Sequence, residues 1–224
     1  MLTRRTLGVI FDMDGVLVDS ADAHYEAWCI LGKELGKVHT REFFERTFGM
    51  HNREIIPLWL GDVLPREEVD RLSDHKEAVY RQVAATKLRP LDGAMDLLES
   101  LAQDGFLLAI GSSGPRPNVE LMLDVLGVRR FFSAFSTGDE VREGKPHPEV
   151  FLAAARKLGL PPRECAVVED APQGIQAGLA AGARVIAVTS TRAPAELGAA
   201  HLVVDSLKEL DPRRIRALLG GGDS

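Results

Sequence analysis

Residue types that can act together on a charged substrate occur in four segments of the chain. In each segment they stand where a buried strand is predicted to end or where a helix is predicted to begin. Ligands of open parallel sheets bind beyond the carboxyl ends of the strands, so we expect the four segments to meet at one place. The residues are Asp12 and Asp14, Ser112 and Ser113, Lys145, and Glu169 and Asp170.

The gathered carboxylates predict a bound cation. Three or four carboxylates held close together repel one another, and their pKa values rise unless a positive charge compensates. Mg²⁺ prefers oxygen ligands and commonly binds one or two carboxylates, waters and a phosphate oxygen. Lys145 adds positive charge, and Ser112 with the amides around Ser113 offers donors for phosphate oxygens. Together these groups indicate phosphoryl transfer, because that reaction depends on positioning and charge neutralisation.

The two aspartates that follow the first strand are predicted to divide the chemistry between them. Asp12 can attack phosphorus and form an aspartyl phosphate. Asp14 can protonate the leaving oxygen and later deprotonate the attacking water. Gly15 allows a sharp turn, which lets both side chains reach the same face.

Each segment also has a plain structural interpretation when it is taken alone. The sequence DMDG at 12–15 can be a turn, and GSSG at 111–114 can be a loop. Lys145 can be a solvated surface lysine, and the acidic pair at 169–170 can begin a helix. The catalytic interpretation is favoured because all the segments occur in order, each at a strand end or before a helix.

Short apolar runs alternate with helical periodicity along most of the chain. The runs suit strands that are buried on both faces of a parallel sheet, and several of the helices end at glycine. This alternation predicts an α/β fold with a Rossmann-like parallel sheet as its core. The strands are predicted at residues 7–11, 106–110, 166–168, 184–188 and 201–204, and the helices at 94–103, 117–126, 148–158 and 173–181.

Residues 20–89 interrupt the alternation with helical periodicity and no convincing strand. His24, Trp28, Leu31 and Leu35 follow one another at spacings of four, three and four, which places them on one helix face. We therefore predict a mostly helical cap domain at residues 20–89, inserted into an α/β core formed by residues 1–19 and 90–224.

Composition narrows the class of protein. The 224 residues carry a formal net charge of −6 and no basic cluster, which argues against a nucleic-acid partner. No stretch reaches the roughly 18 apolar residues of a membrane helix. The chain has 2 cysteines, too few for a disulfide scaffold. We expect a cytoplasmic monomer that acts on a small-molecule phosphate ester, with no membrane partner.

The motifs resemble those of the haloacid dehalogenase-like hydrolase superfamily over the whole chain. Residues 11–20 (FDMDGVLVDS) look like its first motif, and Ser112, Lys145 and residues 168–174 (VEDAPQG) match the second, third and fourth. The helical insertion after the first motif resembles the cap of the subgroup that contains β-phosphoglucomutase and many sugar-phosphate and phosphoglycolate phosphatases.

This resemblance implies a role for each matching residue. Asp12 would be the nucleophile, and Asp14 the acid/base that also offers its backbone carbonyl to the metal. Ser112, with Ser113 beside it, would bind phosphate, and Lys145 would steady the charge on the nucleophile and the phosphate. Asp170 with Glu169 would complete the magnesium site. Dehalogenases of the superfamily lack the second aspartate, which is present here as Asp14.

The resemblance also extends to three residues of the predicted cap. His24, Arg53 and Lys76 match substrate-contacting positions of β-phosphoglucomutase, with a one-residue adjustment around Arg53. As alternatives, His24 can be a partly buried histidine on an apolar helix face, and Arg53 and Lys76 can be solvated surface charges.

The sequence favours one function and leaves two alternatives open. We predict a magnesium-dependent phosphatase for small phosphorylated metabolites, sugar phosphates in particular, that works through an aspartyl phosphate. The first alternative is a phosphosugar mutase of the β-phosphoglucomutase type, whose aspartyl phosphate must be protected from water. The second is a catalytically idle phosphate-binding protein, which the presence of Asp12, Asp14 and Asp170 disfavours.

Overall fold

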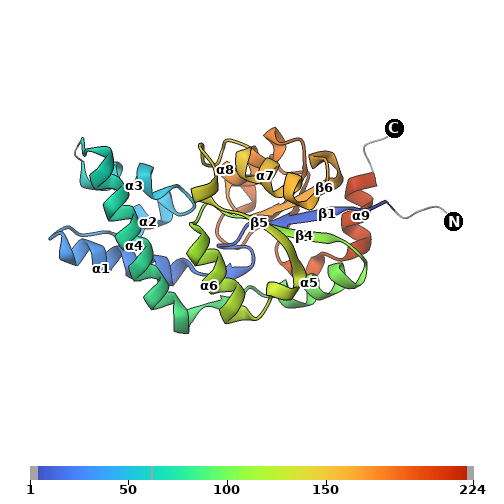
Figure 1. Cartoon of the computed structure of the whole chain (residues 1–224), viewed down its shortest axis with the longest axis horizontal. Coiled ribbons are helices and arrows are strands. Elements are labelled where there is room, and N and C mark those ends of the chain that lie inside the picture. Colours follow the sequence, from blue (N-terminus) through green and yellow to red (C-terminus); the bar gives the residue numbers. More distant parts are fainter. Residues whose placement is uncertain (1–4, 62, 221–224) are drawn as a thin grey trace.

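The core of the molecule is a six-stranded parallel sheet (Figure 1). A computed structural model of the chain describes residues 5–61 and 63–220. The strands lie in the order β5-β4-β1-β6-β7-β8, which confirms the predicted parallel α/β fold. The strands are β1 (Gly8–Phe11), β4 (Leu107–Gly111), β5 (Phe132–Ser136), β6 (Cys165–Glu169), β7 (Arg184–Val188) and β8 (Leu202–Val204).

Helices cover both faces of this sheet. Side chains of the central strand alternate between two apolar layers: Val9 and Phe11 join one buried cluster, and Ile10 joins the other. Residues of α5, α6 and α9 complete the first layer, and residues of α7 and α8 complete the second. These helices are α5 (Ala94–Gln103), α6 (Arg116–Leu126), α7 (Glu149–Leu158), α8 (Pro172–Ala180) and α9 (Pro212–Gly220).

Short 3-10 helices occupy several of the loops that join the strands and helices. They are η1 (Arg129–Phe131), η2 (Gly138–Glu140), η3 (Pro162–Glu164), η4 (Pro194–Glu196) and η5 (Leu207–Glu209).

The register of the central strands aligns their carboxyl ends. Phe11 of β1 pairs with Ile110 of β4 on one side and with Val168 of β6 on the other. The residues that follow these three positions therefore emerge at the same edge of the sheet. They include Asp12, Gly111 and Glu169.

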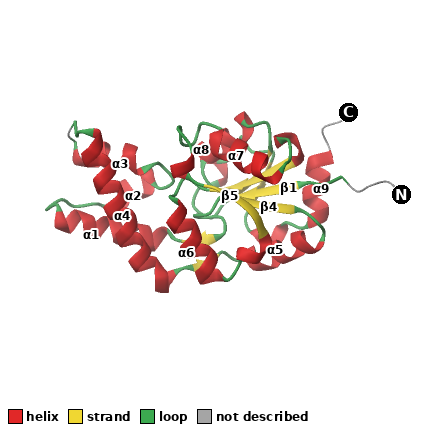
Figure 2. Cartoon of the chain, viewed as in Figure 1, coloured by secondary structure: helices red, strands yellow, loops and turns green. Residues whose placement is uncertain are grey.

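Four helices form a separate layer beside this edge (Figure 2). They have an apolar cluster of their own, in which Trp28, Leu31, Phe44 and Ile56 are buried. We propose that residues 20–89 are a cap domain and that the rest of the chain is its core. The outer ends of this predicted core, residues 1–4 and 221–224, lie outside the described residues. The helices are α1 (Ala21–Glu34), α2 (Arg41–Thr47), α3 (Asn52–Leu60) and α4 (Arg66–Lys87).

The chain passes between core and cap through a two-stranded antiparallel ribbon. Its strands are β2 (Val18–Asp19) and β3 (Arg89–Pro90), with Val18 paired to Pro90 and Asp19 to Arg89. Neither strand was predicted from the sequence, because two residues are too few to show an apolar pattern.

Strand β5, at the edge of the sheet, was not predicted from the sequence either. This strand carries Ser133 between Phe132 and Ala134, and most of its residues are only partly buried or exposed. An edge strand of this kind lacks the continuous apolar run that marks the central strands. The other predicted strands and helices occur, with ends that differ by one or two residues.

Two further observations bear on the predicted class of protein. None of the helices that the structure describes is long and apolar enough to cross a membrane. Cys29 on α1 and Cys165 at the start of β6 are both free thiols.

Candidate active site

The ends of the two central strands bring three carboxylates together. Asp12 follows β1, Glu169 ends β6 and Asp170 comes next. One oxygen atom of each lies within 4.8 Å of the corresponding oxygens of the other two. All three residues are buried, with exposed fractions of 8%, 1% and 3%. The predicted convergence of the strand-end acids therefore occurs in the structure.

A lysine from a different loop enters the same group. The Nζ atom of Lys145 lies 2.6 Å from Asp12 Oδ1 and 2.6 Å from Glu169 Oε1. Burial would lower the pKa of Lys145, but the charges of Asp12 and Glu169 outweigh it and hold that pKa above its ordinary value. Lys145 is thus an ammonium ion that binds the two carboxylates of adjacent strands.

One lysine does not balance three buried acids. Burial, with a further contribution from Glu169, raises the pKa of Asp12 to about 7 although Lys145 acts in the opposite direction. The pKa of Asp170 is also well above its ordinary value, because of burial and the nearby Glu169 and Asp12. Both shifts indicate that the group lacks positive charge.

The donor set fits Mg²⁺, a hard cation that takes carboxylate oxygens. Asp12, Glu169 and Asp170 are the residues that would hold it. When bound there, the ion would neutralise charge on the carboxylates and on a phosphate group. The carboxylate of Asp14 lies outside the group of three. The predicted contribution of Asp14 is through its backbone carbonyl, and this stays a prediction.

Glycine and hydroxyl residues hold the acids in place. The backbone amides of Asp170 and Ala171 donate to Glu169 Oε2 at 2.8 and 2.9 Å. A Cβ atom at Gly174 would lie 1.6 Å from Glu169 Oε1, so only glycine leaves room for this carboxylate. Thr191, in the loop after β7, donates a hydrogen bond to Asp170 Oδ2.

Asp14 lies closer to the cap than the other acids do. Ser20 Oγ donates to Asp14 Oδ1 at 2.5 Å, and His24 Nε2 lies 3.4 Å from the same oxygen. Gly15, the next residue, has a φ of +80°, and a Cβ there would come within 2.3 Å of Asp170 Oδ2. The sharp turn predicted at Gly15 is therefore present, and Asp170 leaves no room for a side chain there.

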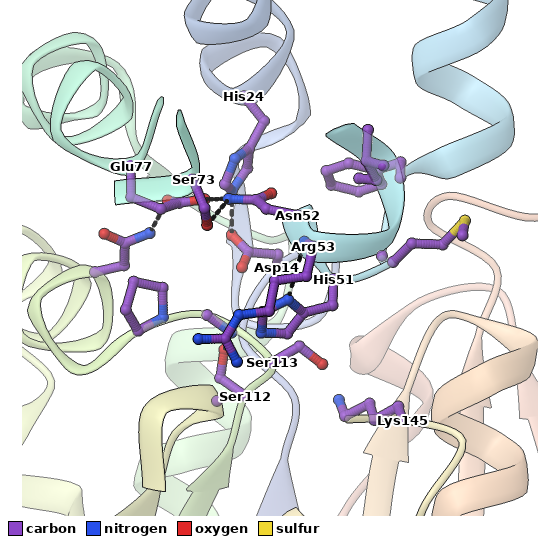
Figure 3. A pocket seen from close by; sticks show the side chains of 18 of the residues that line it. Asp14, His24, His51, Asn52, Arg53, Ser73, Glu77, Ser112, Ser113 and Lys145 are labelled. Atoms are coloured by element: carbon purple, nitrogen blue, oxygen red, sulfur yellow. Dashed lines mark hydrogen bonds and ion pairs between the residues drawn. The ribbon is translucent and has the colours of Figure 1, made fainter. Parts of the chain in front are cut away.

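The two serines after β4 line the side of the cavity opposite the cap helices (Figure 3). Ser112 is 1% exposed, and its backbone amide donates to the Ser136 carbonyl of β5 at 3.0 Å. Its hydroxyl accepts from the Gly114 amide at 3.0 Å, which fixes the turn that presents Ser113. Ser112 and Ser113 thus line the same cavity as Asp12, where their hydroxyl groups can donate to a phosphate.

The cap contributes a buried lysine and a histidine. Lys76 is 2% exposed, so the alternative that it is a solvated surface charge is wrong. Its Nζ lies 2.7 Å from His24 Nδ1 and 2.8 Å from Glu77 Oε1. Tyr80 stacks on the His24 ring, with centroids 3.8 Å apart. Lys76 is buried because it lies on the same face of α4 as the apolar residues Val69, Leu72 and Tyr80.

Arg53 lies at the outer part of the cavity. Its side chain is 51% exposed, and Nε donates to Asp70 Oδ1 at 2.6 Å. About half of the Arg53 side chain is therefore solvated, as the alternative interpretation expected. Arg53 nevertheless also lines the cavity, together with His51 and Ser73. Burial lowers the pKa of His51, which favours its neutral form.

These groups enclose one cavity of about 270 Å³ between the strand ends and the cap. Every residue that the sequence analysis proposed for the site lines it. They are Asp12, Asp14, His24, Arg53, Lys76, Ser112, Ser113, Lys145, Glu169 and Asp170.

A comparison with family models decides the relationship. The model of the haloacid dehalogenase-like hydrolases matches residues 6–182, which include all four motifs. The chain belongs to this family. The resemblance inferred from the motifs is therefore confirmed.

Several relatives of this haloacid dehalogenase-like hydrolase are named as phosphatases. Hexitol phosphatase A of Escherichia coli is 33% identical over 92% of the chain and 94% of the relative. The chloroplastic 5-amino-6-(5-phospho-D-ribitylamino)uracil phosphatase of Arabidopsis thaliana is 34% identical over 91% of the chain. The match spans only about half of that plant protein, 55% of its length.

A solved structure has the same fold as this hydrolase. β-Phosphoglucomutase from Clostridium difficile superimposes with a TM-score of 0.86 at 27% identity, over 97% of this chain and 98% of that one.

Sequence reasoning overlooked three residues around the site of this hydrolase. Glu77 accepts hydrogen bonds from Lys76 and from Asn118, and Thr191 donates one to Asp170. Glu77 follows Lys76 directly, so recognising the lysine as buried would have indicated a nearby acid. No local pattern marks Asn118 or Thr191, because their partners are distant in the sequence.

Proposed function

We propose that the chain is a magnesium-dependent phosphatase that hydrolyses small phosphorylated metabolites, sugar or polyol phosphates in particular. The observation that carries this proposal is the buried group of Asp12, Glu169, Asp170 and Lys145, which lines the same cavity as Asp14. The cavity thus contains a candidate nucleophile (Asp12), a candidate cation site and a candidate acid/base (Asp14). The names of the phosphatase relatives support the same reaction.

In the first step a carboxylate oxygen of Asp12 attacks phosphorus, and the bond from phosphorus to the ester oxygen breaks. Asp14 gives a proton to the leaving oxygen, which departs as an alcohol. Lys145 and the donors of the Ser112 turn stabilise the charge that spreads over the phosphoryl oxygens. The product of this step is an aspartyl phosphate on Asp12.

In the second step water attacks the phosphorus of the aspartyl phosphate. Asp14, now a carboxylate, takes a proton from this water, and the bond from phosphorus to the Asp12 oxygen breaks. Inorganic phosphate leaves, and both aspartates return to their starting forms. Asp14 can serve both steps because it lines the same cavity as Asp12, which stands two positions earlier in the chain.

The charges of the cavity favour hydrolysis over the mutase reaction. A mutase that works through an aspartyl phosphate must make a sugar bisphosphate and bind it in both orientations, so its cavity needs a second phosphate site. Among the described residues, each lysine or arginine that lines this cavity already contacts a carboxylate. A second phosphate would therefore have to compete with a carboxylate for its cation, as with Asp70 for Arg53.

The mutase is the second candidate, because the fold superimposes closely on β-phosphoglucomutase. Phosphate release from sugar phosphates, polyol phosphates, phosphoglycolate and nucleotides, with Mg²⁺ and with a chelator, tests the proposal. Each substrate is paired with an assay for conversion of β-glucose 1-phosphate to glucose 6-phosphate. Magnesium-dependent phosphate release supports the phosphatase, whereas isomerisation with little free phosphate would replace it with the mutase.

Absence of both reactions from the folded protein would favour the idle phosphate-binding alternative.

The predicted monomeric state and cytoplasmic location stay predictions, and one of the relatives is named as chloroplastic. Size-exclusion chromatography with light scattering tests the first of them.

A further inference from the structure

A buried asparagine of the core binds the cap beside the cavity. Asn118 lies in the first turns of α6 and is 1% exposed. Its Nδ2 donates to Glu77 Oε2 at 2.5 Å, and its Oδ1 accepts from Arg81 Nη1 at 3.0 Å. Both partners belong to α4 of the cap. A single amide therefore uses its donor and its acceptor on two cap residues.

Glu77 also forms hydrogen bonds within the cap. Its Oε1 accepts from Lys76 Nζ at 2.8 Å and from Asn52 Nδ2 at 2.7 Å. Burial acts to raise the pKa of Glu77, but Lys76, His24 and the amide of Asn118 outweigh it and lower that pKa to about 2. Glu77 is thus a carboxylate with donors on both oxygens: Lys76 and Asn52 donate to Oε1, and Asn118 of the core donates to Oε2.

The next contact determines which nitrogen of His24 carries the proton. The Lys76 ammonium has only donors, so His24 Nδ1 at 2.7 Å must accept from it. The proton of the neutral ring then lies on Nε2, which faces Asp14 Oδ1 at 3.4 Å. Ser20 donates to the same oxygen. Both contacts therefore meet the same oxygen, Oδ1, of a carboxyl group that lines the cavity.

We propose that Asn118 is a positioning residue for the acid/base Asp14 and acts through Glu77, Lys76 and His24. The chain of contacts begins and ends in the core and passes through three cap residues between. It is complete only where the cap is docked on the core, so it couples that docking to the orientation of Asp14. This inference rests on the proposed phosphatase reaction, in which Asp14 protonates the leaving oxygen.

The leaving group provides the readout. An alkyl phosphate such as a hexitol 6-phosphate needs a proton on its poor leaving oxygen, whereas p-nitrophenyl phosphate leaves as a stable phenolate. The value of kcat/KM reports formation of the aspartyl phosphate for both. We expect Asn118→Ala to lower kcat/KM by about tenfold or more for the alkyl ester and by less than about threefold for the aryl ester. A residue that merely stabilised the fold would lower both equally.

Two further variants separate the contacts of Asn118. Asn118→Asp keeps the shape and the acceptor for Arg81 but puts a carboxylate against Glu77, so its selective loss should equal or exceed that of Asn118→Ala. Arg81→Ala removes the other contact and should leave the alkyl-to-aryl ratio within about twofold of the wild-type value. The same selective loss in Arg81→Ala, with none in Asn118→Asp, would overturn the proposal.

A double variant and a spectrum complete the test. Because the residues act in series, the double variant Asn118→Ala/His24→Ala should have the same alkyl-to-aryl ratio of kcat/KM as His24→Ala alone. A double variant in which the two losses multiply would contradict the series. In ¹⁵N-histidine NMR spectra, we expect His24 protonated on Nε2 in the wild type and a mixture of tautomers in folded Asn118→Ala. An unchanged tautomer would contradict the proposed route, even if both substitutions slowed turnover.

The wild-type enzyme distinguishes this inference from the function on which it rests. If it hydrolyses both esters with Mg²⁺ and the Asn118 variants keep the wild-type ratio, the phosphatase stands and the positioning role fails. If the wild type hydrolyses neither ester, the proposed function fails and the positioning role with it.

Discussion

Two buried lysines, one from the core and one from the cap, differ in the number of carboxylates around them. Lys145 of the core binds Asp12 and Glu169 at 2.6 Å, with Asp170 close by. Lys76 of the cap binds the single carboxylate of Glu77 at 2.8 Å. The group around Lys145 therefore has an excess of negative charge, whereas Lys76 and Glu77 balance each other.

This difference separates two tasks that share one cavity. An excess of buried negative charge creates a site for a cation, and that cation can in turn neutralise a phosphate group. A balanced hydrogen-bonded network instead fixes the direction of side chains without attracting further charge. We expect changes on the core side to abolish chemistry and metal binding, and changes on the cap side to alter selectivity among substrates.

The largest effect should come from the predicted nucleophile. Asp12→Asn keeps the volume of the side chain but removes the attacking carboxylate, so turnover of every phosphate ester should fall by at least about 10³-fold. Phosphate release measures this. Asp124→Asn, an exposed aspartate on α6, is the matched control and should keep wild-type activity. Near-normal turnover in Asp12→Asn would remove Asp12 from its predicted role.

The next effect concerns the metal. In the wild type, Mg²⁺ should raise the melting temperature, because it relieves repulsion among Asp12, Glu169 and Asp170. Asp170→Asn should weaken Mg²⁺ binding by at least about tenfold, judged from the concentration needed for the shift and for turnover. The predicted cofactor would be contradicted if neither Mg²⁺ nor a chelator changed the melting temperature or the activity of the wild-type protein.

A smaller and selective effect is expected on the cap side. His24→Ala should lower turnover of a sugar phosphate by about tenfold, while that of a small aryl phosphate changes by less than about threefold. The matched control is His75→Ala, an exposed histidine of α4 that binds Glu34 away from the cavity. Equal losses for the two substrates would favour a purely structural histidine at position 24.

The smallest effect concerns stability of the cap and not catalysis. His39 is 3% exposed and stacks on Trp28, and burial lowers its pKa from 6.5 to about 4. Between these values the unfolded chain binds a proton that the folded protein excludes, so stability falls as the pH drops from 6.5 toward 4.

His39→Phe keeps the aromatic contacts and removes the imidazole that binds this proton in the unfolded chain. Its melting temperature should fall less than that of the wild type between pH 7 and pH 4.5, with a difference of about 2–5 °C. Calorimetry at the two pH values checks this. Identical pH dependence in both proteins would show that His39 takes no part in acid destabilisation.

The sequence predicted the core site better than the cap because its signals are local. Asp12 and Glu169 follow short apolar runs, and parallel strands must deliver such residues to one edge. Lys76 was harder to place, since lysine is rarely buried, although its helix face already contained Val69, Leu72 and Tyr80.

Other features depend on contacts between distant parts of the chain. Asn118 and Glu77 are 41 positions apart and meet only because the cap lies on the core. Strand β5 is defined by its pairing to β4, and not by an apolar run of its own. Neither could be read from the neighbouring residues alone.

The ribbon of β2 and β3 gives the cap the properties of an exchangeable module. Its entry and exit residues, Val18 and Pro90, are direct partners across two paired strands. A different insert, or a short turn, could join the same two points without displacing the loop that holds Asp12 and Asp14. A lineage with this arrangement can acquire new substrates by replacing one continuous segment while its phosphoryl chemistry is inherited unchanged.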